Sequence, residues 1–397
     1  MHRRSIAIVT FGCQMNDRDS EALVGIFLDK GYILTEDIYQ ADVILVNTCS
    51  VRKHAEDRAI SFIGSIRKII EYRQGKNNSL RSVVGLIGCM ARSRGEEIFK
   101  KMPHVNLICS SAMLYKLPEY AEEILKGDKD RIIDLEDNKR EEWFYHSPFR
   151  FDKNHAYVVI STGCSNYCSY CVVPYVRGEL RLRDPQDIIE EVKKNISLGI
   201  KKITLLGQNV NDYYYIYSDN YSGVRILGGE EIKDKNIFSF VDLLKELDKI
   251  DEIEEIDFIT SHPKNTSRDL FYLMANSKKF KKHLHLPFQS GSDRILKLMN
   301  RGYTKDKYLS LVDDFKMIVK GTLSTDVIVG FPTETEDDFL HTKDVLEKVK
   351  FKYAYIFKYS VRQNTQSAKL EDDVSQGEKE RRHRILLELQ KRLSLSI

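Results

Sequence analysis

The chain has 397 residues, of which 42% are hydrophobic and 30% charged, the composition of an ordinary globular protein of two or three domains. No apolar run approaches the about 18 residues of a membrane span, and the apolar stretch after the basic start is too short for a signal peptide. Seven scattered cysteines, an odd count, argue against a secreted disulfide framework and predict reduced thiols in the cytoplasm. The net charge of +3 permits nucleic-acid binding without favouring it.

The first 125 residues repeat one pattern, in which an apolar run ends in a cysteine and a helical stretch follows. The runs before the cysteines are residues 5–12, 41–48 and 82–88, and the helical stretches are residues 16–31, 50–69 and 90–102. Continuous β-branched runs that alternate with helices predict an open parallel sheet covered on both faces. We therefore expect an α/β domain over residues 1–125.

Cys13, Cys49 and Cys89 each come just after one of these predicted strands. In open parallel sheets, ligands gather outside the carboxyl ends of the strands, so we expect the three thiols to converge on one edge. A single free cysteine is more commonly a small buried hydrophobe, but packing gives no reason for three at equivalent strand ends. Cys109 also ends a strand-like run, and we expect it to serve packing.

A charged stretch over residues 126–147 is predicted to be a linker with one short strand. Apolar runs and helical stretches such as residues 185–199 and 335–350 then alternate again. The predicted strands are residues 156–162, 201–207, 255–260, 283–287, 324–331 and 353–360. Six such units predict a barrel or partial barrel whose functional face is the carboxyl end of its strands. We expect this domain to span residues 148–381 and a basic helix to occupy residues 382–397.

Three further cysteines, Cys164, Cys168 and Cys171, follow the first strand of the predicted barrel at close spacing. Three thiolates can hold three irons of a [4Fe–4S] cube and leave the fourth iron open to a small molecule. The alternative is a zinc knuckle, but structural zinc has four protein ligands, and no fourth Cys or His lies nearby after Cys171. We favour the iron–sulfur cluster.

Two further segments give weaker indications of structure and function. Residues 212–236 form a predicted irregular insertion rich in tyrosine and glycine. Its aromatic rings have the chemistry to stack on nucleic-acid bases, but a tyrosine-rich surface loop is the interpretation that we favour. Residues 378–397 form a basic amphipathic pattern, which we expect to be a helix packed on the barrel.

Eight segments in order identify a family. They are TFGCQMNDRDSE, NTCSVRKHAED, GCMARS, STGCSNYCSYCVVPYVRGE, LLGQNVNDY, TSHP, LHLPFQSGSDRIL and DVIVGFPTETEDDF. Together they resemble the radical SAM methylthiotransferases over essentially the whole chain. The resemblance is closest to the branch that converts N6-isopentenyladenosine in tRNA to its 2-methylthio derivative. Sister branches carry a lysine–valine or proline–lysine pair in place of Gln14 and Met15, and they depart from the GQNVN segment.

The resemblance implies a radical SAM partial barrel after the N-terminal sheet domain, and two [4Fe–4S] clusters. Cys164, Cys168 and Cys171 would hold the cluster that binds and cleaves S-adenosylmethionine. Cys13, Cys49 and Cys89 would hold an auxiliary cluster that bears the transferred sulfur. The residues expected to contact S-adenosylmethionine are Gln208, Asn209, Ser261, Gln289 and Glu334, although each is of a type that also caps turns.

The resemblance also implies partners: isopentenylated tRNA, and an electron donor such as flavodoxin or ferredoxin. We expect a cytoplasmic monomer without membrane contact. Members of the family usually end in a small all-β RNA-binding domain, which we expect to be absent here. The remaining RNA contacts would then come from the terminal helix, with Arg381, Arg382, Arg384, Lys391 and Arg392. The alternatives are the sister enzyme that acts on threonylcarbamoyl-adenosine in tRNA, and a non-catalytic iron–sulfur RNA-binding protein.

Overall fold

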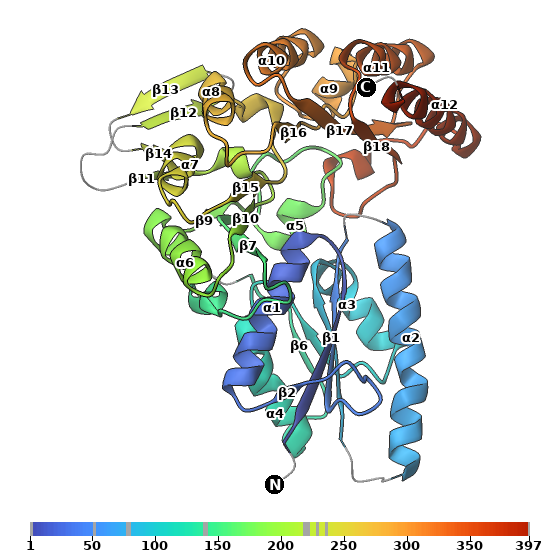
Figure 1. Cartoon of the computed structure of the whole chain (residues 1–397). Helices are drawn as coiled ribbons and strands as arrows, with labels where there is room; N and C mark the ends of the chain where they lie inside the picture. The colour runs from blue at the N-terminus through green and yellow to red at the C-terminus, as the bar shows by residue number, and fades with distance from the viewer. Residues whose placement is uncertain are drawn as a thin grey trace. The chain divides into compact units, whose positions relative to one another are not determined.

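The computed structural model describes residues 3–50, 53–76, 81–137, 142–216, 223–227, 230–234 and 237–395 (Figure 1). The chain forms two compact units. The first comprises Met1–Lys153 and Val172–Glu179, and the second comprises Asn154–Cys171 and Leu180–Ile397. The first unit therefore extends beyond the predicted boundary at residue 125, and it also takes in a short segment that follows Cys171.

The first unit is built on a six-stranded sheet in the order β2-β1-β3-β4-β5-β6, in which every pairing is parallel. The strands are β1 (Ser5–Phe11), β2 (Ile33–Leu34), β3 (Val43–Thr48), β4 (Val83–Gly88), β5 (Leu107–Cys109) and β6 (Ile132–Asp134). All residues of β3 and β4 are buried, as continuous apolar runs predict for a sheet covered on both faces. The short strand of the predicted linker is β6, which pairs with β5.

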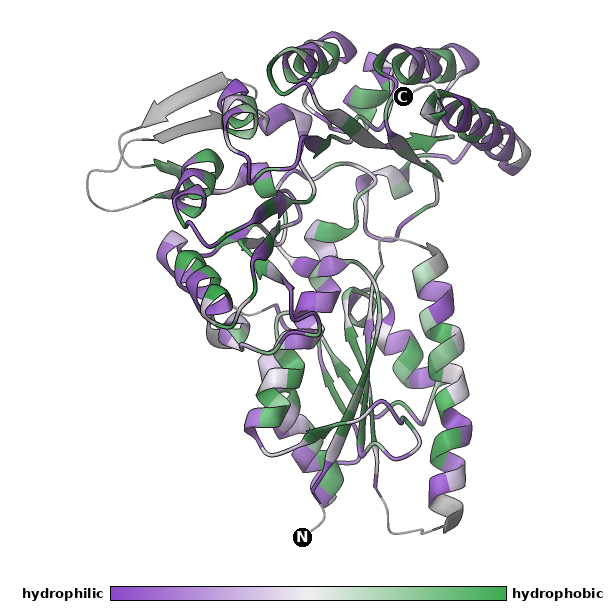
Figure 2. Ribbon diagram, in the orientation of Figure 1, coloured by the Kyte–Doolittle hydropathy of each residue, from purple (hydrophilic) through white to green (hydrophobic). Residues whose placement is uncertain are grey.

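Helices cover both faces of this sheet. They are α1 (Gln14–Asp29), α2 (Lys53–Lys76), α3 (Cys89–Lys101) and α4 (Leu117–Lys126), with 3-10 turns at Leu114–Lys116 and Glu142–His146. The short α5 (Val173–Arg177) also belongs to this unit and packs beside Cys89 of α3. Helices α2 and α3 share one apolar core with the sheet, and α1 and α4 lie on its other side (Figure 1). Figure 2 shows the strands between them as largely hydrophobic.

The second unit contains the six predicted strands, which form two three-stranded parallel sheets. Their orders are β7-β10-β15 and β16-β17-β18. The strands are β7 (His155–Val159), β10 (Lys202–Leu206), β15 (Glu255–Phe258), β16 (His283–His285), β17 (Thr322–Val329) and β18 (Tyr353–Lys358). An isolated parallel bridge joins Ile256, in β15, to Phe280, just before β16. The predicted α/β architecture, with an open parallel sheet followed by a six-stranded partial barrel, is confirmed.

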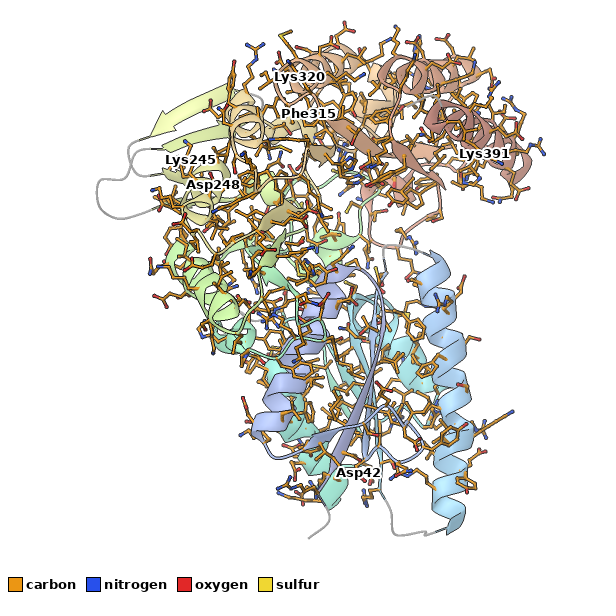
Figure 3. All side chains as sticks on the ribbon, viewed as in Figure 1. Asp42, Lys245, Asp248, Phe315, Lys320 and Lys391 are labelled. Carbon is orange, nitrogen blue, oxygen red and sulfur yellow. The ribbon has the colours of Figure 1, made fainter. Side chains whose placement is uncertain are left out.

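Helices alternate with these strands and lie on their outer side (Figure 1). They are α6 (Pro185–Ser197), α7 (Phe240–Asp248), α8 (Arg268–Asn276), α9 (Asp293–Leu298), α10 (Lys305–Ile318), α11 (Glu336–Val349) and α12 (Gln376–Ser394). Three 3-10 turns occur at Val210–Asp212, Pro263–Asn265 and Gln366–Lys369. Phe315 of α10, labelled in Figure 3, is fully buried in the core that these helices share with the strands.

The insertion after β10 contains two antiparallel strand pairs rather than an irregular loop. Strand β11 (Tyr214–Ile216) pairs with β14 (Ile237–Ser239), and β12 (Gly223–Leu227) pairs with β13 (Glu230–Asp234). Residues 217–222, 228–229 and 235–236 of the insertion lie outside the described residues. The stacking of its tyrosines on bases stays a prediction.

The terminal helix α12 begins at Gln376 rather than at residue 382, because Ser375 caps it by accepting a hydrogen bond from the backbone N–H of Glu378. Its buried residues Leu386 and Leu389 join the core of the second unit, so the expected packing on the barrel is found. Lys391 lies on the exposed side of this helix (Figure 3). Among the described residues, no helix combines the length and the apolar content that crossing a membrane requires.

Candidate functional site

The carboxyl edge of the first sheet carries the three cysteines predicted there. Cys13 is the N-cap residue of α1 after β1, Cys49 follows β3 directly, and Cys89 is the first residue of α3 after β4. Strands β1, β3 and β4 are neighbours, and Thr48 at the end of β3 is the register partner of both Phe11 and Gly88. The parallel register therefore aligns the three strand ends.

The tight turn into α3 depends on Gly88. Its φ of +84° lies in the left-handed region, and a Cβ there would come within 2.6 Å of the backbone oxygen of Thr48. Any larger residue would clash with the neighbouring strand and displace the following residue, Cys89.

The thiol of Cys13 has a pKa well below its usual value. Its interaction with the Cys49 side chain lowers the pKa of the Cys13 thiol to about 5. Burial raises this pKa, whereas the positive charge of Arg177 and the backbone hydrogen bonds from Met15 and Asn16 lower it further. Cys89 accepts a hydrogen bond from the Arg177 side chain, with 3.2 Å between Nε and Sγ. The edge thus brings Cys13 next to Cys49, and Arg177 acts on both Cys13 and Cys89.

Two buried asparagines, which the sequence analysis did not single out, brace this edge. Asn16 donates from Nδ2 to Oδ1 of Asn47 (2.8 Å) and to the backbone oxygen of Thr48 (3.2 Å). Asn47 donates back to the backbone oxygen of Asn16 at 2.9 Å. The side-chain oxygen of Asn16 accepts from the thiol of Cys13 at 3.4 Å. The pair therefore ties the end of β3 to the first turn of α1.

The second group of cysteines lies on the loop after β8 (Ser161–Thr162), whose partner strand is β9 (Arg181–Leu182). Cys168 is buried, whereas Cys164 and Cys171 are partly exposed. Burial raises the pKa of Cys164, and the hydrogen bonds from Asn166 oppose this shift. The backbone N–H of Cys171 donates to the backbone oxygen of Cys168 at 2.9 Å.

Side chains and backbone from the end of α9 hold this loop in place. The Asn300 amide donates to the backbone oxygens of Asn166 (3.3 Å) and Tyr167 (3.0 Å). Tyr167 adopts a positive φ of 47°, a backbone conformation that is uncommon for residues other than glycine. The hydrogen bond from Asn300 to its backbone oxygen stabilises this conformation. The backbone N–H of Ser169 donates to the oxygen of Met299 at 2.9 Å.

A buried arginine also contacts this cysteine group. Arg301 donates from one guanidinium nitrogen to Sγ of Cys168 (3.3 Å) and to the hydroxyl of Tyr170 (3.4 Å). Its other terminal nitrogen donates to the backbone oxygen of Pro287 at 3.1 Å. Each group of three cysteines therefore has one thiol that accepts a hydrogen bond from a buried arginine. Arg177 lies within the family segment STGCSNYCSYCVVPYVRGE, and Arg301 lies shortly after LHLPFQSGSDRIL. Nothing else in the local sequence marks either arginine as part of a site.

The five residues predicted to contact S-adenosylmethionine all come soon after barrel strands, and most are buried. Gln208 and Asn209 follow β10, Ser261 follows β15, Gln289 follows β16 and Glu334 follows β17. Gln208 is partly exposed, and the other four are less than 9% exposed. Gln289 adopts a φ of +67° and is held by backbone hydrogen bonds with Asp326 and Ile328.

Several of these side chains carry buried polar atoms without a hydrogen-bond partner among the described residues. They are both amide atoms of Asn209, the hydroxyl of Ser261 and Oε1 of Glu334. Nε2 of His262, a residue that the sequence analysis did not single out, is also buried without a hydrogen-bond partner among the described residues. Burial, with the charges of Arg301 and Lys264, lowers the pKa of His262 well below its usual value. A buried polar group without a partner costs about 1–3 kcal/mol, so these atoms at the barrel's carboxyl end are suited to a polar ligand.

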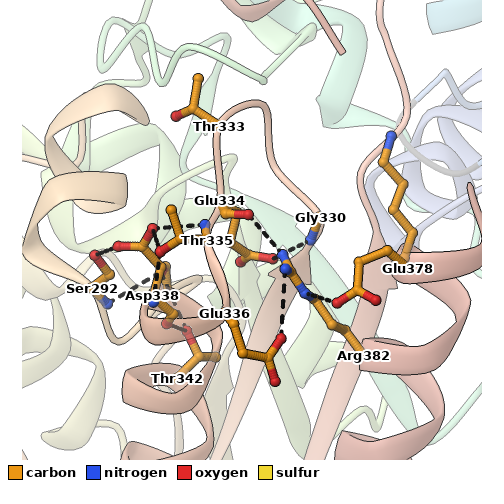
Figure 4. Close-up of polar contacts among 12 residues, drawn as sticks. Ser292, Gly330, Thr333, Glu334, Thr335, Glu336, Asp338, Thr342, Glu378 and Arg382 are labelled. Atoms are coloured by element: carbon orange, nitrogen blue, oxygen red, sulfur yellow. Dashed lines mark hydrogen bonds and ion pairs between the residues drawn. The ribbon is translucent and has the colours of Figure 1, made fainter. Parts of the chain in front are cut away.

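The two carboxylate oxygens of Glu334 differ: Oε2 is hydrogen-bonded (Figure 4), whereas Oε1 has no hydrogen-bond partner in the described part of the chain. Its Oε2 accepts from the backbone N–H of Gly330 (2.6 Å) and from the guanidinium of Arg382 (2.7 Å). Burial raises the pKa of Glu334, and these two hydrogen bonds act against the shift. Arg382 also donates to Glu378 at 2.8 Å.

This network corrects part of the expected RNA-contacting surface of α12. Arg382 is buried against Glu334, and Arg381 is paired with Glu378 and Glu336, so neither side chain is an unpaired surface cation. Arg384, Lys391 and Arg392 of the predicted set are exposed.

Cys109 is fully buried and donates its thiol to the backbone oxygen of Ser110 (3.6 Å), in agreement with the packing role. Within the described part of the chain, no three His, Cys, Asp or Glu side chains converge closely enough to hold a single metal ion. The thiolates that hold a [4Fe–4S] cube each bind a different iron and do not meet at one ion, so both cysteine groups remain compatible with clusters.

The same two regions match known families. A profile described as "Radical SAM superfamily" matches residues 158–346, and one described as "Uncharacterized protein family UPF0004" matches residues 5–110. Among solved structures, the fold resembles the radical S-adenosylmethionine methyltransferase TsrM from Kitasatospora setae, with a TM-score of 0.62, 13% identity, and coverage of 92% of this chain and 77% of that chain. That structure contains cobalamin and a [4Fe-4S] cluster; at this identity the likeness concerns the fold alone.

Curated relatives are much closer in sequence, and they share one name, tRNA-2-methylthio-N(6)-dimethylallyladenosine synthase. The protein from Acetivibrio thermocellus is 43% identical over 391 residues, which are 98% of this chain and 76% of the relative. The one from Clostridium botulinum (strain Loch Maree) is 40% identical over 98% of this chain and 81% of its own length. The chain therefore belongs to the radical SAM superfamily and, within it, to the family of the tRNA-2-methylthio-N(6)-dimethylallyladenosine synthases.

Proposed function

We propose that the chain transfers a methylthio group to C2 of N6-isopentenyladenosine beside the anticodon of tRNA. The observation that carries the proposal is the presence of two cysteine triads in two units of one chain. One triad lies at the carboxyl ends of three parallel strands, and the other lies on the loop after β8. Relatives that align with 98% of the chain, at 40–43% identity, are named as synthases of this product.

In this proposal Cys164, Cys168 and Cys171 hold one [4Fe–4S] cluster, and Cys13, Cys49 and Cys89 hold the second. Each cube would keep one iron without a protein ligand. When bound, the clusters would relay the electron from an external donor, and the clusters and S-adenosylmethionine would supply the carbon radical, the sulfur and the methyl group. A radical route suits C2 of adenine, which has no activating group for polar chemistry.

The chain's own residues would bind and orient these groups. Asn209, Ser261 and Glu334 offer their unpartnered polar atoms to S-adenosylmethionine, and Gln208 and Gln289 flank them at the same strand ends. The donor set fits the cofactor, since Oε1 of Glu334 accepts hydrogen bonds whereas the Asn209 amide both donates and accepts. The buried position of these residues helps to exclude water, which protects a reactive intermediate from side reactions.

The finer assignments follow from the same proposal. The tRNA substrate would be the isopentenylated form. A low-potential donor such as flavodoxin or ferredoxin would supply the electron, and the chain would act as a monomer in the cytoplasm. The odd, scattered set of seven cysteines fits a reducing compartment.

The test is nucleoside mass spectrometry of tRNA from a strain that lacks its own synthase and carries this gene. We expect the 2-methylthio derivative of N6-isopentenyladenosine to return. Formation of the methylthio derivative of threonylcarbamoyl-adenosine alone would assign the chain to the sister branch. A third outcome is that neither nucleoside forms. If the purified chain then carries both clusters and binds tRNA, but makes no 5′-deoxyadenosine under reduction, the non-catalytic binding protein is supported instead.

A further inference from the structure

Arg177 occupies an unusual position in the chain. It ends the short helix α5, in the segment Val172–Glu179, which belongs to the first compact unit although the residues on both sides of it belong to the second. Val172 and Val176 of this segment pack against Cys89 in one buried apolar cluster. The segment is thus seated on the edge that carries the first cysteine group.

The side chain of Arg177 is 3% exposed and joins a thiol to a carboxylate. Its Nε donates to Sγ of Cys89 at 3.2 Å, and one terminal nitrogen donates to Asp19 at 3.0 Å. Asp19 has a fully buried side chain, and it also accepts a hydrogen bond from the hydroxyl of Tyr145 at 2.9 Å. The guanidinium is therefore fixed from two sides, with one N–H directed at the thiol.

Such a buried contact needs a reason, because taking an arginine out of water is costly even when one carboxylate pairs with it. A packing role would be served by an apolar side chain. An always-charged donor aimed at a thiol is suited instead to a thiolate in a metal cluster, since N–H···S hydrogen bonds and nearby positive charge stabilise the more negative, reduced state of iron–sulfur clusters.

We propose that Arg177 is a positioning residue that raises the reduction potential of the cluster held by Cys13, Cys49 and Cys89, through its hydrogen bond to Cys89, and that Asp19 moderates this effect while orienting the guanidinium. The inference rests on the proposed function, which assigns these three cysteines as ligands. It goes further by naming the group that sets the properties of that one cluster.

The experiment uses the full chain with Cys164, Cys168 and Cys171 all changed to alanine, so that only the cluster of interest remains. Midpoint potentials are measured by redox titration followed by electron paramagnetic resonance, together with the iron content. With Arg177→Met the potential should become more negative, because the reduced cluster loses a donor and a positive charge. With Arg177→Lys the potential should lie between the value with Arg177 intact and the value of Arg177→Met, since lysine keeps the charge but not the planar fork.

Asp19→Asn gives a shift of opposite sign, towards more positive potential, because it removes a negative charge. A purely structural role for Arg177 would not produce opposite shifts in the two variants. The matched control is Arg94→Met on α3, where Arg94 pairs with Glu97 on the surface; it should leave the potential unchanged.

An unchanged potential in iron-loaded Arg177→Met or Arg177→Lys would overturn the inference. So would loss of the cluster in both variants while Arg94→Met loads normally, because Arg177 would then be needed for assembly rather than tuning. If the alanine background with Arg177 intact carries no iron–sulfur cluster, the failure lies in the assignment of the three ligands and therefore in the proposed function.

Discussion

Arg382 of the terminal helix donates both to Oε2 and to the backbone oxygen of Glu334, at 2.7 and 2.9 Å (Figure 4). The other carboxylate oxygen, Oε1, is buried without a hydrogen-bond partner among the described residues. The terminal helix therefore fixes the orientation of a carboxylate at the carboxyl end of the barrel, and leaves one of its oxygens available to a ligand.

The first prediction is that Arg382→Met weakens binding of S-adenosylmethionine by at least about tenfold. Loss of a charge-assisted hydrogen bond costs about 1.5–3 kcal/mol, and 1.4 kcal/mol corresponds to a tenfold change in affinity. Isothermal titration calorimetry on the cluster-loaded protein measures this. Arg384→Met, an exposed residue of the same helix, is the control, and equal affinities in the two variants would contradict the role of Arg382.

The second prediction concerns metal content. Anaerobic reconstitution should give about eight irons per chain, the sum of two cubes, and changing Cys164, Cys168 and Cys171 together to alanine should leave about four. Colorimetric iron and sulfide analysis is the measurement. A wild-type value near four, or zinc in place of iron, would refute the two-cluster assignment.

The third prediction is that the two cysteine triads have separable roles, because they lie in different compact units. With Cys13→Ala, formation of 5′-deoxyadenosine from S-adenosylmethionine should persist while thiomethylation of tRNA stops. With Cys168→Ala, both should stop. Chromatography of the small-molecule product and mass spectrometry of the tRNA nucleosides read out the two activities. Equal loss of cleavage in both variants, with the Cys13 variant still carrying its other cluster, would show that the roles are misassigned.

The positions of the six cysteines could be predicted because they depend on strand periodicity and on local spacing. The strand ends at Cys13, Cys49 and Cys89 follow from apolar runs in the sequence, and all parallel strands present their carboxyl ends at one edge. The contacts made by Arg177 and Arg382 could not, since they join residues that are 88 and 48 positions apart. Only tertiary packing decides that α5 joins the first unit and that a basic residue of α12 turns inward.

The fourth prediction concerns Asp338 in the first turn of α11, which forms a capping box with the N-cap residue Thr335. It accepts hydrogen bonds from the hydroxyl of Ser292 (2.5 Å), from the backbone N–H of Thr335 (2.9 Å) and from Arg294. Burial raises the pKa of Asp338, but these bonds outweigh it and hold the pKa well below its usual value. Asp338→Asn should therefore lower the free energy of unfolding by about 1–3 kcal/mol at pH 7.

The pH dependence of this effect has a definite sign. Because the folded-state pKa is depressed, the ionised Asp338 stabilises the fold fully above its unfolded pKa of about 4. The stabilisation is lost as the pH falls below that value towards the folded pKa. The difference in urea midpoint between wild type and variant should shrink from pH 7 towards pH 3, and a constant difference over this range would contradict the assignment.

The fifth prediction is that Gly88→Ala removes the second cluster selectively. The added methyl would meet the backbone oxygen of Thr48 at 2.6 Å and the side-chain oxygen of Asn47 at 2.5 Å, in a residue already held at a φ of +84°. The turn must shift, and Cys89 would move with it. Iron should fall from about eight to about four, while 5′-deoxyadenosine formation is retained. Gly64→Ala is the control, because its Cβ would meet nothing within 4 Å. Full iron content in Gly88→Ala would show that the edge accommodates the methyl group and that Cys89 does not depend on this turn.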